Sequence, residues 1–496
     1  MQLGFRRAAE NCTPAACAPR SVGLRRKSTA AFALKPTSQT LPRLQSLAAA
    51  LALCVAGLGC VGTRTPDEQT ARRDVQHVAA AYRPGDQRPT LPTLTTNSPL
   101  ADFLAFAILN DPKVEAAYYD WVAAVERITP ARSLPNPRVT FQMDIMSIVT
   151  SLMPGLMLDL PGPGKLGARA AVASAESTAK YFAFEFSVVQ AAFSLKKAYY
   201  QLFFLADKIR VSRQILELLS DLERLARAQN SVGKVTLQDV LRAQIELDRL
   251  NTEIAGLSDS RQLLITQFKA ALGLGPDRPE PPLPARFEST PLNLSADQLW
   301  QTALARNPRL QGMAAEVAGA EAAIRLARRE RIPDFSVGIE ADVKALPTMY
   351  RPQLGFTLPI WRDKIAAEIA AAQAGKRAAA ARLSAEQITL AVELADKLFN
   401  YRESSRNLVL LEDKLLAKGR QSVAVAQSGY LSGKIDFFNL IDAQRTLLGF
   451  LLSEVEARIQ RELALAEISH LLLGTAPPNA PVLSEPPGAP KPKTLR

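Results

Sequence analysis

The chain has 496 residues, of which 47% are apolar, 22% charged and only 6% aromatic, a composition that suits a folded, helix-rich protein. Its net charge of +12 would fit a nucleic-acid or anionic-lipid partner, but residues 1–59 alone hold eight basic residues and one acid. The rest of the chain carries no basic stripe, which argues against nucleic acid. All four cysteines lie at or before position 60, so the main body cannot hold a disulfide framework or a thiolate metal site.

Residues 1–59 are expected to be an export signal. An apolar stretch of about twelve residues, 47–58, follows Arg43, and that is the length of a signal-peptide core and too short to span a bilayer. It ends in Gly57-Leu58-Gly59-Cys60, and a bacterial lipoprotein signal also ends in small residues before a cysteine that receives lipid. The leucine stands one position closer to the cysteine than that pattern prefers. Lipidation of Cys60 is the first interpretation, and cleavage near Gly59 with a free cysteine is the alternative.

The remaining sequence contains an internal repeat with an offset of about 200 residues. The paired landmarks, in chain order, are Asp111-Pro112 with Asn307-Pro308, Pro135 with Pro333, Leu160-Pro161 with Leu358-Pro359, Gly233-Lys234 with Gly433-Lys434, Ala243-Gln244 with Ala443-Gln444, and Gly273 with Gly474. This period is too long for a solenoid and indicates a duplicated half-domain.

Each half is predicted to begin with helix and to continue with two strands. In the first half, helical sequence over 100–132 ends before Pro135 and Pro137, and alternating residues follow at 139–145 and 156–160. In the second half, Phe335, Val337, Ile339, Ala341 and Val343 share one face of a strand, opposite Glu340, Asp342 and Lys344. The return strand places Leu354, Phe356 and Leu358 on one face.

These strands favour a membrane barrel that several subunits share. A transmembrane β-strand needs ~9–11 residues, apolar toward lipid and polar toward a lumen. Four such strands cannot bury both faces of an isolated sheet or close around a channel. The side chains expected to face lipid are Phe335, Val337, Ile339, Phe356 and Leu358.

A long helical hairpin is predicted after each strand pair. Helices over 165–229 and 363–428 carry apolar residues at steps of three and four, as in a coiled coil. Gly233 and Gly433 suit left-handed caps at the two turns. Thr236 with Asp239 forms a predicted capping box for the first return helix, and Asp436 is the predicted N-cap of the second.

The residues of a catalytic or metal site are missing from this sequence. His77 and His470 are the two histidines, and no His/Cys cluster can form. Gly162-Pro163-Gly164-Lys165 lacks the full phosphate-loop spacing, so a turn before a helix is the better interpretation. We therefore expect no cofactor, no bound metal and no enzymatic activity.

Helix, strand, strand and long hairpin, written twice, resemble the TolC-like outer membrane efflux proteins. The resemblance covers roughly residues 98–475. Its most specific parts are the hairpin-tip sequences at 233–244 and 429–444, the second of which has Ile441 where the family's pattern has leucine.

The resemblance implies a homotrimer in the outer membrane that extends into the periplasm. Three subunits would form a 12-stranded β-barrel in outer membrane lipid and an α-barrel below it. The tips, Gly233, Lys234, Gly433 and Lys434, would contact a periplasmic adaptor protein and thereby an inner-membrane pump. The expected divisions are 1–59 (signal), 60–97 (periplasmic segment), 98–275 (first repeat), 276–292 (linker), 293–475 (second repeat) and 476–496 (Pro-rich tail).

By the same resemblance, the pore gate lies early in the helix that returns from the second turn. The matching positions are Asn439 and Asp442, and Asn439 departs from the family's acidic residue. Asp239 would stabilise the closed state by bonding to the neighbouring helix. The alternatives are that Asp442 is a solvated surface charge and that Asp239 is only a cap.

Two other functions and the cargo stay open. An envelope-spanning coiled-coil structural protein would explain the long helices but not the paired amphipathic strands. The channel of a type I protein secretion system would share the whole architecture. The sequence at 160–165 resembles the metal-efflux branch of the family slightly, and drugs, metal ions and proteins all stay possible cargoes.

Overall fold

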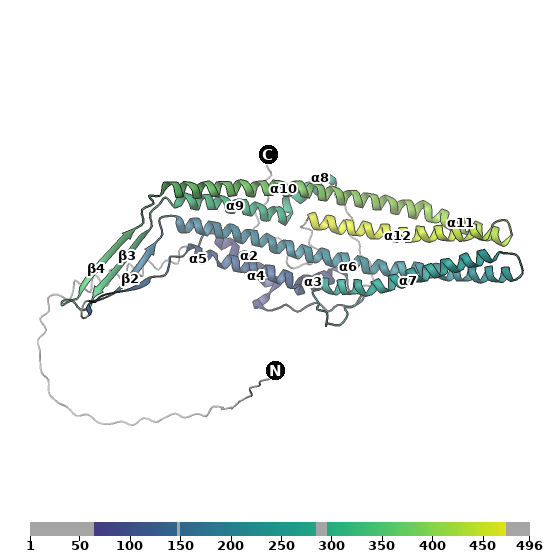
Figure 1. Cartoon of the computed structure of the whole chain (residues 1–496), viewed down its shortest axis with the longest axis horizontal. Coiled ribbons are helices and arrows are strands. Elements are labelled where there is room, and N and C mark those ends of the chain that lie inside the picture. Colours follow the sequence, from purple (N-terminus) through teal and green to yellow (C-terminus); the bar gives the residue numbers. More distant parts are fainter. Residues whose placement is uncertain (1–63, 146–148, 284–294, 473–496) are drawn as a thin grey trace, which may run out of the picture. The chain divides into compact units, whose positions relative to one another are not determined.

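The computed structural model describes residues 64–145, 149–283 and 295–472, all within the unit Cys60–Arg496. This part of the chain is mostly α-helix with one small antiparallel sheet (Figure 1). The predicted fold class, mainly α with a small β part, is confirmed at this level.

The two halves share the order of two helices, two strands and a long helical hairpin. The first half has two extra helical elements at its start and a five-residue helix before its strands, and a π-helical turn interrupts the second hairpin. The first half contains α2 (Pro66–Tyr82), η1 (Pro84–Asp86), α3 (Leu100–Asn110), α4 (Pro112–Glu126), α5 (Ile128–Arg132), β1 (Arg138–Ile145), β2 (Val149–Leu160), α6 (Lys165–Ser231) and α7 (Leu237–Ala271). The second half contains α8 (Ala296–Arg306), α9 (Pro308–Arg329), β3 (Phe335–Asp342), β4 (Met349–Phe356), α10 (Arg362–Leu410), the π-helical turn η2 (Leu411–Leu415), α11 (Leu416–Leu431) and α12 (Phe437–Leu472).

The helical segment expected over 100–132 is divided into three helices. Asp111 ends α3 and caps α4, because its Oδ1 accepts a hydrogen bond from the backbone N–H of Lys113 at 2.8 Å and Pro112 follows at the first helical position. Asn307 caps α9 in the same way, accepting from the N–H of Arg309 at 2.9 Å. The two Asx-Pro landmarks of the sequence thus share a capping role.

The four strands pair in the order β1-β2-β3-β4, with every neighbouring pair antiparallel. The central pairing joins the two halves, with Leu158 opposite Val337 and Leu160 opposite Phe335. The outer strands β1 and β4 are the two edges of the sheet. Figure 1 shows the sheet at one end of the long helices and the turns of both hairpins at the other end.

Both predicted hairpins are present. Helix α6 has 67 residues, which corresponds to about 100 Å at the α-helical rise. The hairpins are held together by apolar clusters, one midway that includes Leu195, Phe268 and Val455, and one near the turns that includes Leu222 and Leu440. The helix that leads to the first turn, α6, is continuous, whereas η2 interrupts the corresponding helix of the second hairpin between α10 and α11.

Helix α2 packs on the other elements of the first half. Tyr82, Tyr118, Trp121 and Phe184 form an aromatic cluster, in which Trp121 and Phe184 stack with ring centroids 5.8 Å apart. All four side chains are buried, so aromatic packing fixes α2 to α4 and α6.

Candidate channel sites

The sheet exposes its apolar face. Phe335, Val337 and Ile339 of β3 are 42%, 46% and 40% exposed, and Phe356 of β4 is 61% exposed. The register places further exposed apolar side chains on the same face, namely Val139, Phe141, Met143, Leu156 and Leu354. Leu358, which was also expected to face lipid, is exposed but follows the end of β4. Exposed apolar patches of this kind mark interaction surfaces.

The opposite face of the sheet is polar and partly covered. Glu340 and Asp342 are only 4% and 8% exposed. Thr140 Oγ1 donates to a carboxylate oxygen of Glu340 at 3.5 Å, and Ser151 donates to Asp144 at 2.7 Å. Lys344 lies just after β3 and is exposed. The sheet thus inverts the ordinary rule that apolar side chains lie inside.

A buried lysine joins the strands to the helices. Lys165, at the start of α6, is 2% exposed, and its Nζ lies 2.9 Å from Asp334 and 3.1 Å from Glu330. Burial lowers the pKa of Lys165, but hydrogen bonds to Asp334 and Glu330 outweigh it and leave the pKa raised. Gly162 donates its N–H to Asp334 at 2.7 Å, and a Cβ at Gly162 would lie 2.6 Å from the carbonyl of Pro333. The segment Gly162–Lys165 of the first half therefore packs closely against the residues before β3 in the second half.

The hairpin turns are nearly identical. Gly233 and Gly433 both have φ of +72°, in the left-handed region that favours glycine. In the first turn, the N–H of Lys234 bonds the carbonyl of Gln229 at 3.0 Å, and in the second Lys434 bonds Gly429 at 2.8 Å. All four tip residues predicted from the sequence are exposed, and both lysine side chains are accessible at the ends of the hairpins.

The predicted gate residues lie on an open face of α12. Asn439 and Asp442 are exposed, while Leu440 and Ile441 between them are buried in the hairpin core. Asp239 forms the predicted capping box with Thr236, whose hydroxyl donates to Asp239 at 2.7 Å. The structure therefore gives Asp239 its capping role directly.

Three contacts that the sequence did not reveal join the hairpins near their turns. The Tyr430 hydroxyl donates to Gln229 at 2.6 Å, Arg242 stacks over the ring of Phe438 at 4.9 Å, and Arg445 lies 3.5 Å from Glu246. The partners are about 200 residues apart, so no local pattern could indicate them.

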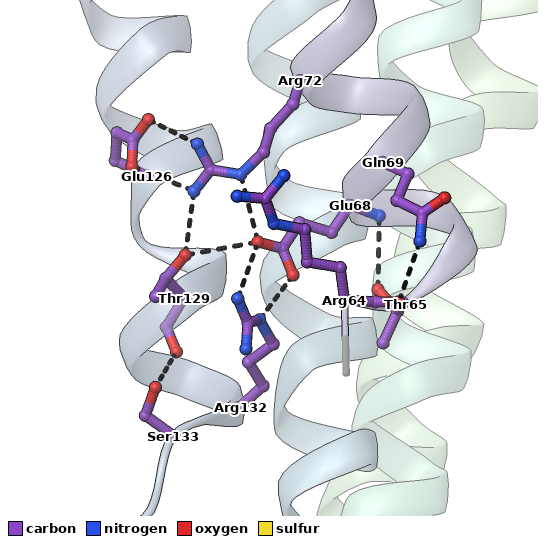
Figure 2. Close-up of polar contacts among 9 residues, drawn as sticks. All are labelled: Arg64, Thr65, Glu68, Gln69, Arg72, Glu126, Thr129, Arg132 and Ser133. Carbon is purple, nitrogen blue, oxygen red and sulfur yellow. Dashed lines mark hydrogen bonds and ion pairs between the residues drawn. The ribbon is translucent and has the colours of Figure 1, made fainter. Parts of the chain in front are cut away.

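A second polar cluster lies at the beginning of α2, and it was also missed. Glu68 is fully buried, and Arg132 donates to it at 2.5 Å while Arg72 donates at 3.1 Å (Figure 2). Arg72 also makes a bidentate contact with Glu126, at 2.7 and 3.0 Å.

Cys60, the predicted lipid site, lies outside the described residues.

The described ranges offer neither a metal centre nor a helical span. Among residues 64–145, 149–283 and 295–472, no three His, Cys, Asp or Glu side chains gather closely enough to hold a metal ion. Within these same ranges, none of the helices has the length and apolar content that crossing a bilayer would require. His470 of α12 is half-buried and stacks on Phe193 of α6, with ring centroids 5.1 Å apart.

Comparison with known proteins decides the family. Residues 104–274 and 299–474 both match the pattern described as outer membrane efflux protein. The chain belongs to the outer membrane efflux protein family. The resemblance inferred from the hairpin tips is thus confirmed, as is the location in the outer membrane with an extension into the periplasm.

Among the relatives is the cobalt-zinc-cadmium resistance protein CzcC of Cupriavidus metallidurans. It is 23% identical over 337 residues, covering 64% of this chain and 77% of that protein. The outer membrane protein VceC of Vibrio cholerae has the same fold, with a TM-score of 0.64, 17% identity, and coverage of 75% of this chain and 95% of VceC. The MtrE outer membrane channel of Neisseria gonorrhoeae, solved in an open state, also has this fold. Its TM-score is 0.63 and its sequence identity 14%, and the match covers 75% of this chain and 88% of MtrE.

Proposed function

We propose that this efflux-family protein is a channel subunit, not an enzyme, and that three copies form one 12-stranded barrel. The observation that carries the proposal is the inverted sheet, whose apolar side chains are exposed on one face while Glu340 and Asp342 are buried on the other. Such a sheet suits lipid outside and a polar lumen inside. Members of the family are trimeric outer membrane channels that work with adaptor and pump partners.

The two edges of the sheet support closure by neighbouring subunits. An open edge of β1 and β4 would be an aggregation risk, and closing the barrel removes it. The central pairing suggests the register between subunits, because β4 corresponds to β2 and β1 corresponds to β3 in the repeat. Leu156 pairs with Ile339 within the chain, so Leu354 of one subunit should pair with Phe141 of the next.

Disulfide trapping tests this arrangement. Directly opposed residues in an antiparallel pair have Cα atoms ~4.5–5.5 Å apart, which permits a disulfide. A chain with Leu354→Cys and Phe141→Cys should give covalent trimers on a denaturing gel under oxidation. The matched control is Leu354→Cys with Thr140→Cys, whose second position lies on the other face. Monomers from the first variant, with intact membrane insertion, would contradict the trimeric barrel.

The same proposal assigns the remaining sites. The exposed tips at Gly233, Lys234, Gly433 and Lys434 would contact the adaptor, which links the channel to an inner-membrane pump. Asn439 and Asp442 would line the gate. Asp239 would support the closed state, either through the neighbouring helix or by fixing the turn as a cap.

Lipid on Cys60 would anchor each subunit. Radioactive palmitate should label the parent protein and leave Cys60→Ala unlabelled. Equal labelling of both proteins would exclude this position.

Metal ions are the cargo class that we test first. The relative CzcC is named for resistance to cobalt, zinc and cadmium, which agrees with the slight resemblance of residues 160–165. Deletion of the gene should sensitise cells to these ions more than to dyes or detergents, and the opposite pattern would favour drug efflux. If deletion removed only a secreted protein from the medium, that result would favour the type I secretion alternative. If the protein were a coiled-coil spacer, it would give no conductance in planar bilayers.

A further inference from the structure

A row of basic side chains lies along helix α2. Arg64, Gln69, Arg72, Arg73 and Gln76 line a surface hollow of about 360 Å³. Arg64 and Arg73 are exposed, as are the two glutamines. Guanidinium groups present planar sets of donors that match phosphate oxygens, so the hollow has the chemistry of an anion site.

The nearby carboxylates do not neutralise this row. Glu68 forms ion pairs with Arg132 and Arg72, and Glu126 forms an ion pair with Arg72 (Figure 2). Within the described ranges, Arg64 and Arg73 have no ion pair with a carboxylate. Asp67 and Asp74, the other carboxylates of α2, line a different hollow with Thr70 and Trp121. On the side of Glu68 and Glu126, the unpaired positive charge is therefore that of Arg64 and Arg73.

The first turn of α2 lies at the end of the helical region that leads into the sheet. Residues Glu68 and Arg72 of α2 contact Arg132 and Glu126 in that order, so α2 runs antiparallel to α4 and α5. Arg132 ends α5, and β1 begins six residues later at Arg138. Six residues of extended chain span at most about 20 Å, so Arg64 is near the base of the sheet.

We propose that this hollow binds the phosphate group of an anionic phospholipid in the periplasm-facing leaflet of the outer membrane. The inference rests on the proposed insertion of the sheet in that membrane. Arg64 would contact the headgroup first, and Arg73 would hold a second oxygen from farther along α2. Cys60 lies four residues before Arg64, so a lipid on it would keep Arg64 within about 14 Å of the bilayer surface.

Lipid binding is measured on the full-length, detergent-purified protein by native mass spectrometry with dihexanoyl phosphatidylglycerol. The Arg64→Gln, Arg73→Gln double variant should bind this lipid at least about tenfold more weakly, because each arginine contributes a charge-assisted hydrogen bond. Replacement of both by lysine should give an intermediate affinity, since lysine keeps the charge but loses the bidentate geometry. Arg377→Gln with Arg382→Gln, which removes two exposed arginines from α10, should bind like the parent protein.

Three results would overturn the inference. They are parent-like affinity of the Arg64→Gln, Arg73→Gln variant, equal affinity of the parent for phosphatidylcholine, and displacement of the lipid by an equal concentration of inorganic phosphate. The last result would show a site for free anions. Conductance of the Arg64→Gln, Arg73→Gln variant in planar bilayers tests the channel proposal separately. Unchanged conductance together with lost lipid binding would support both the channel function and the lipid site.

Discussion

Glu68 shows how a single carboxylate can hold a helix in place. Its side chain is fully buried, and an unpaired buried charge would be strongly destabilising. Burial raises the pKa of Glu68, but hydrogen bonds from Arg132 and Arg72 outweigh it, so the pKa lies below its ordinary value. Thr129 donates a further bond at 3.3 Å. The cluster therefore links α2 to α5 through an ionised group.

Replacement of Glu68 by glutamine should destabilise the protein in a pH-dependent way. A carboxyl group whose pKa is lowered by folding contributes stability above its unfolded pKa, and that contribution disappears as pH falls through the lower, folded value. The gap in melting temperature between the parent and Glu68→Gln should therefore be largest near neutral pH and shrink in acid. Asp67→Asn, at an exposed neighbouring position, is the control with little effect. A gap that stays constant with pH would contradict an ionised Glu68.

Val337 provides a test of which face meets lipid. An arginine at the bilayer midplane on the lipid face costs ~2–4 kcal/mol, and little on the lumen face. Val337→Arg should therefore reduce the yield of assembled trimer in the membrane. Gly338 is a poor control, because a Cβ there would lie 3.0 Å from the carbonyl oxygen of Leu156. Gln353 lies on the polar face opposite Gly338, and Gln353→Arg should assemble normally. Equal assembly of both arginine variants would reverse the face assignment.

At the scale of elements, the long helices were the most predictable and the strands the least. The outgoing helix expected over 165–229 is α6, Lys165–Ser231, because a long apolar periodicity without breakers leaves few alternatives. The first half of β2 was missed since it contains Pro154, and pairing with β3 begins only after it, at Gly155. β4 begins earlier than predicted because its first half contains Pro352, as β2 contains Pro154, and a proline argues against a strand in the sequence pattern.

The hairpin turns allow a test of docking without loss of fold. Gly233 and Gly433 need a positive φ, so substituting them would mix backbone strain with lost contact. The exposed lysines avoid this problem. Lys234→Glu with Lys434→Glu should abolish crosslinking to the adaptor and lower resistance or export while trimers remain in the membrane. Arg377→Glu, on α10 far from the turns in sequence, is the charge control. Full crosslinking in the tip variant would remove the lysines from the docking surface.

At the scale of the whole molecule, the sequence predicted the family and the local geometry of the turns better than the contacts between distant segments. Residues such as Gly233, Thr236 and Asp239 act through their own turn, so local pattern was sufficient. Lys165 with Asp334, and Tyr430 with Gln229, join segments that only the folded repeats bring together. Their distance in sequence is the reason that no motif indicated them.

In the proposed trimer, the gate would be formed by all three subunits together. Asn439 and Asp442 are three residues apart and exposed on one face of α12, so threefold symmetry would turn Asp442 into a ring of three carboxylates. Such a ring favours cations and binds multivalent ones. In planar bilayers, Asp442→Asn should weaken cation selectivity and relieve block by trivalent cations, whereas Asn439→Ser should leave both unchanged.

Asp239 needs a control that separates gating from capping. Thr236→Ala removes the hydroxyl partner of the capping box and keeps the Asp239 charge. If Asp239 stabilises the closed state through the neighbouring helix, Asp239→Asn should raise open conductance and Thr236→Ala should not. Equal rises in both variants would assign Asp239 to the cap, because both lose the same turn geometry. Parent-like conductance and block in Asp442→Asn, together with parent-like conductance in Asp239→Asn, would place the gate elsewhere in the channel.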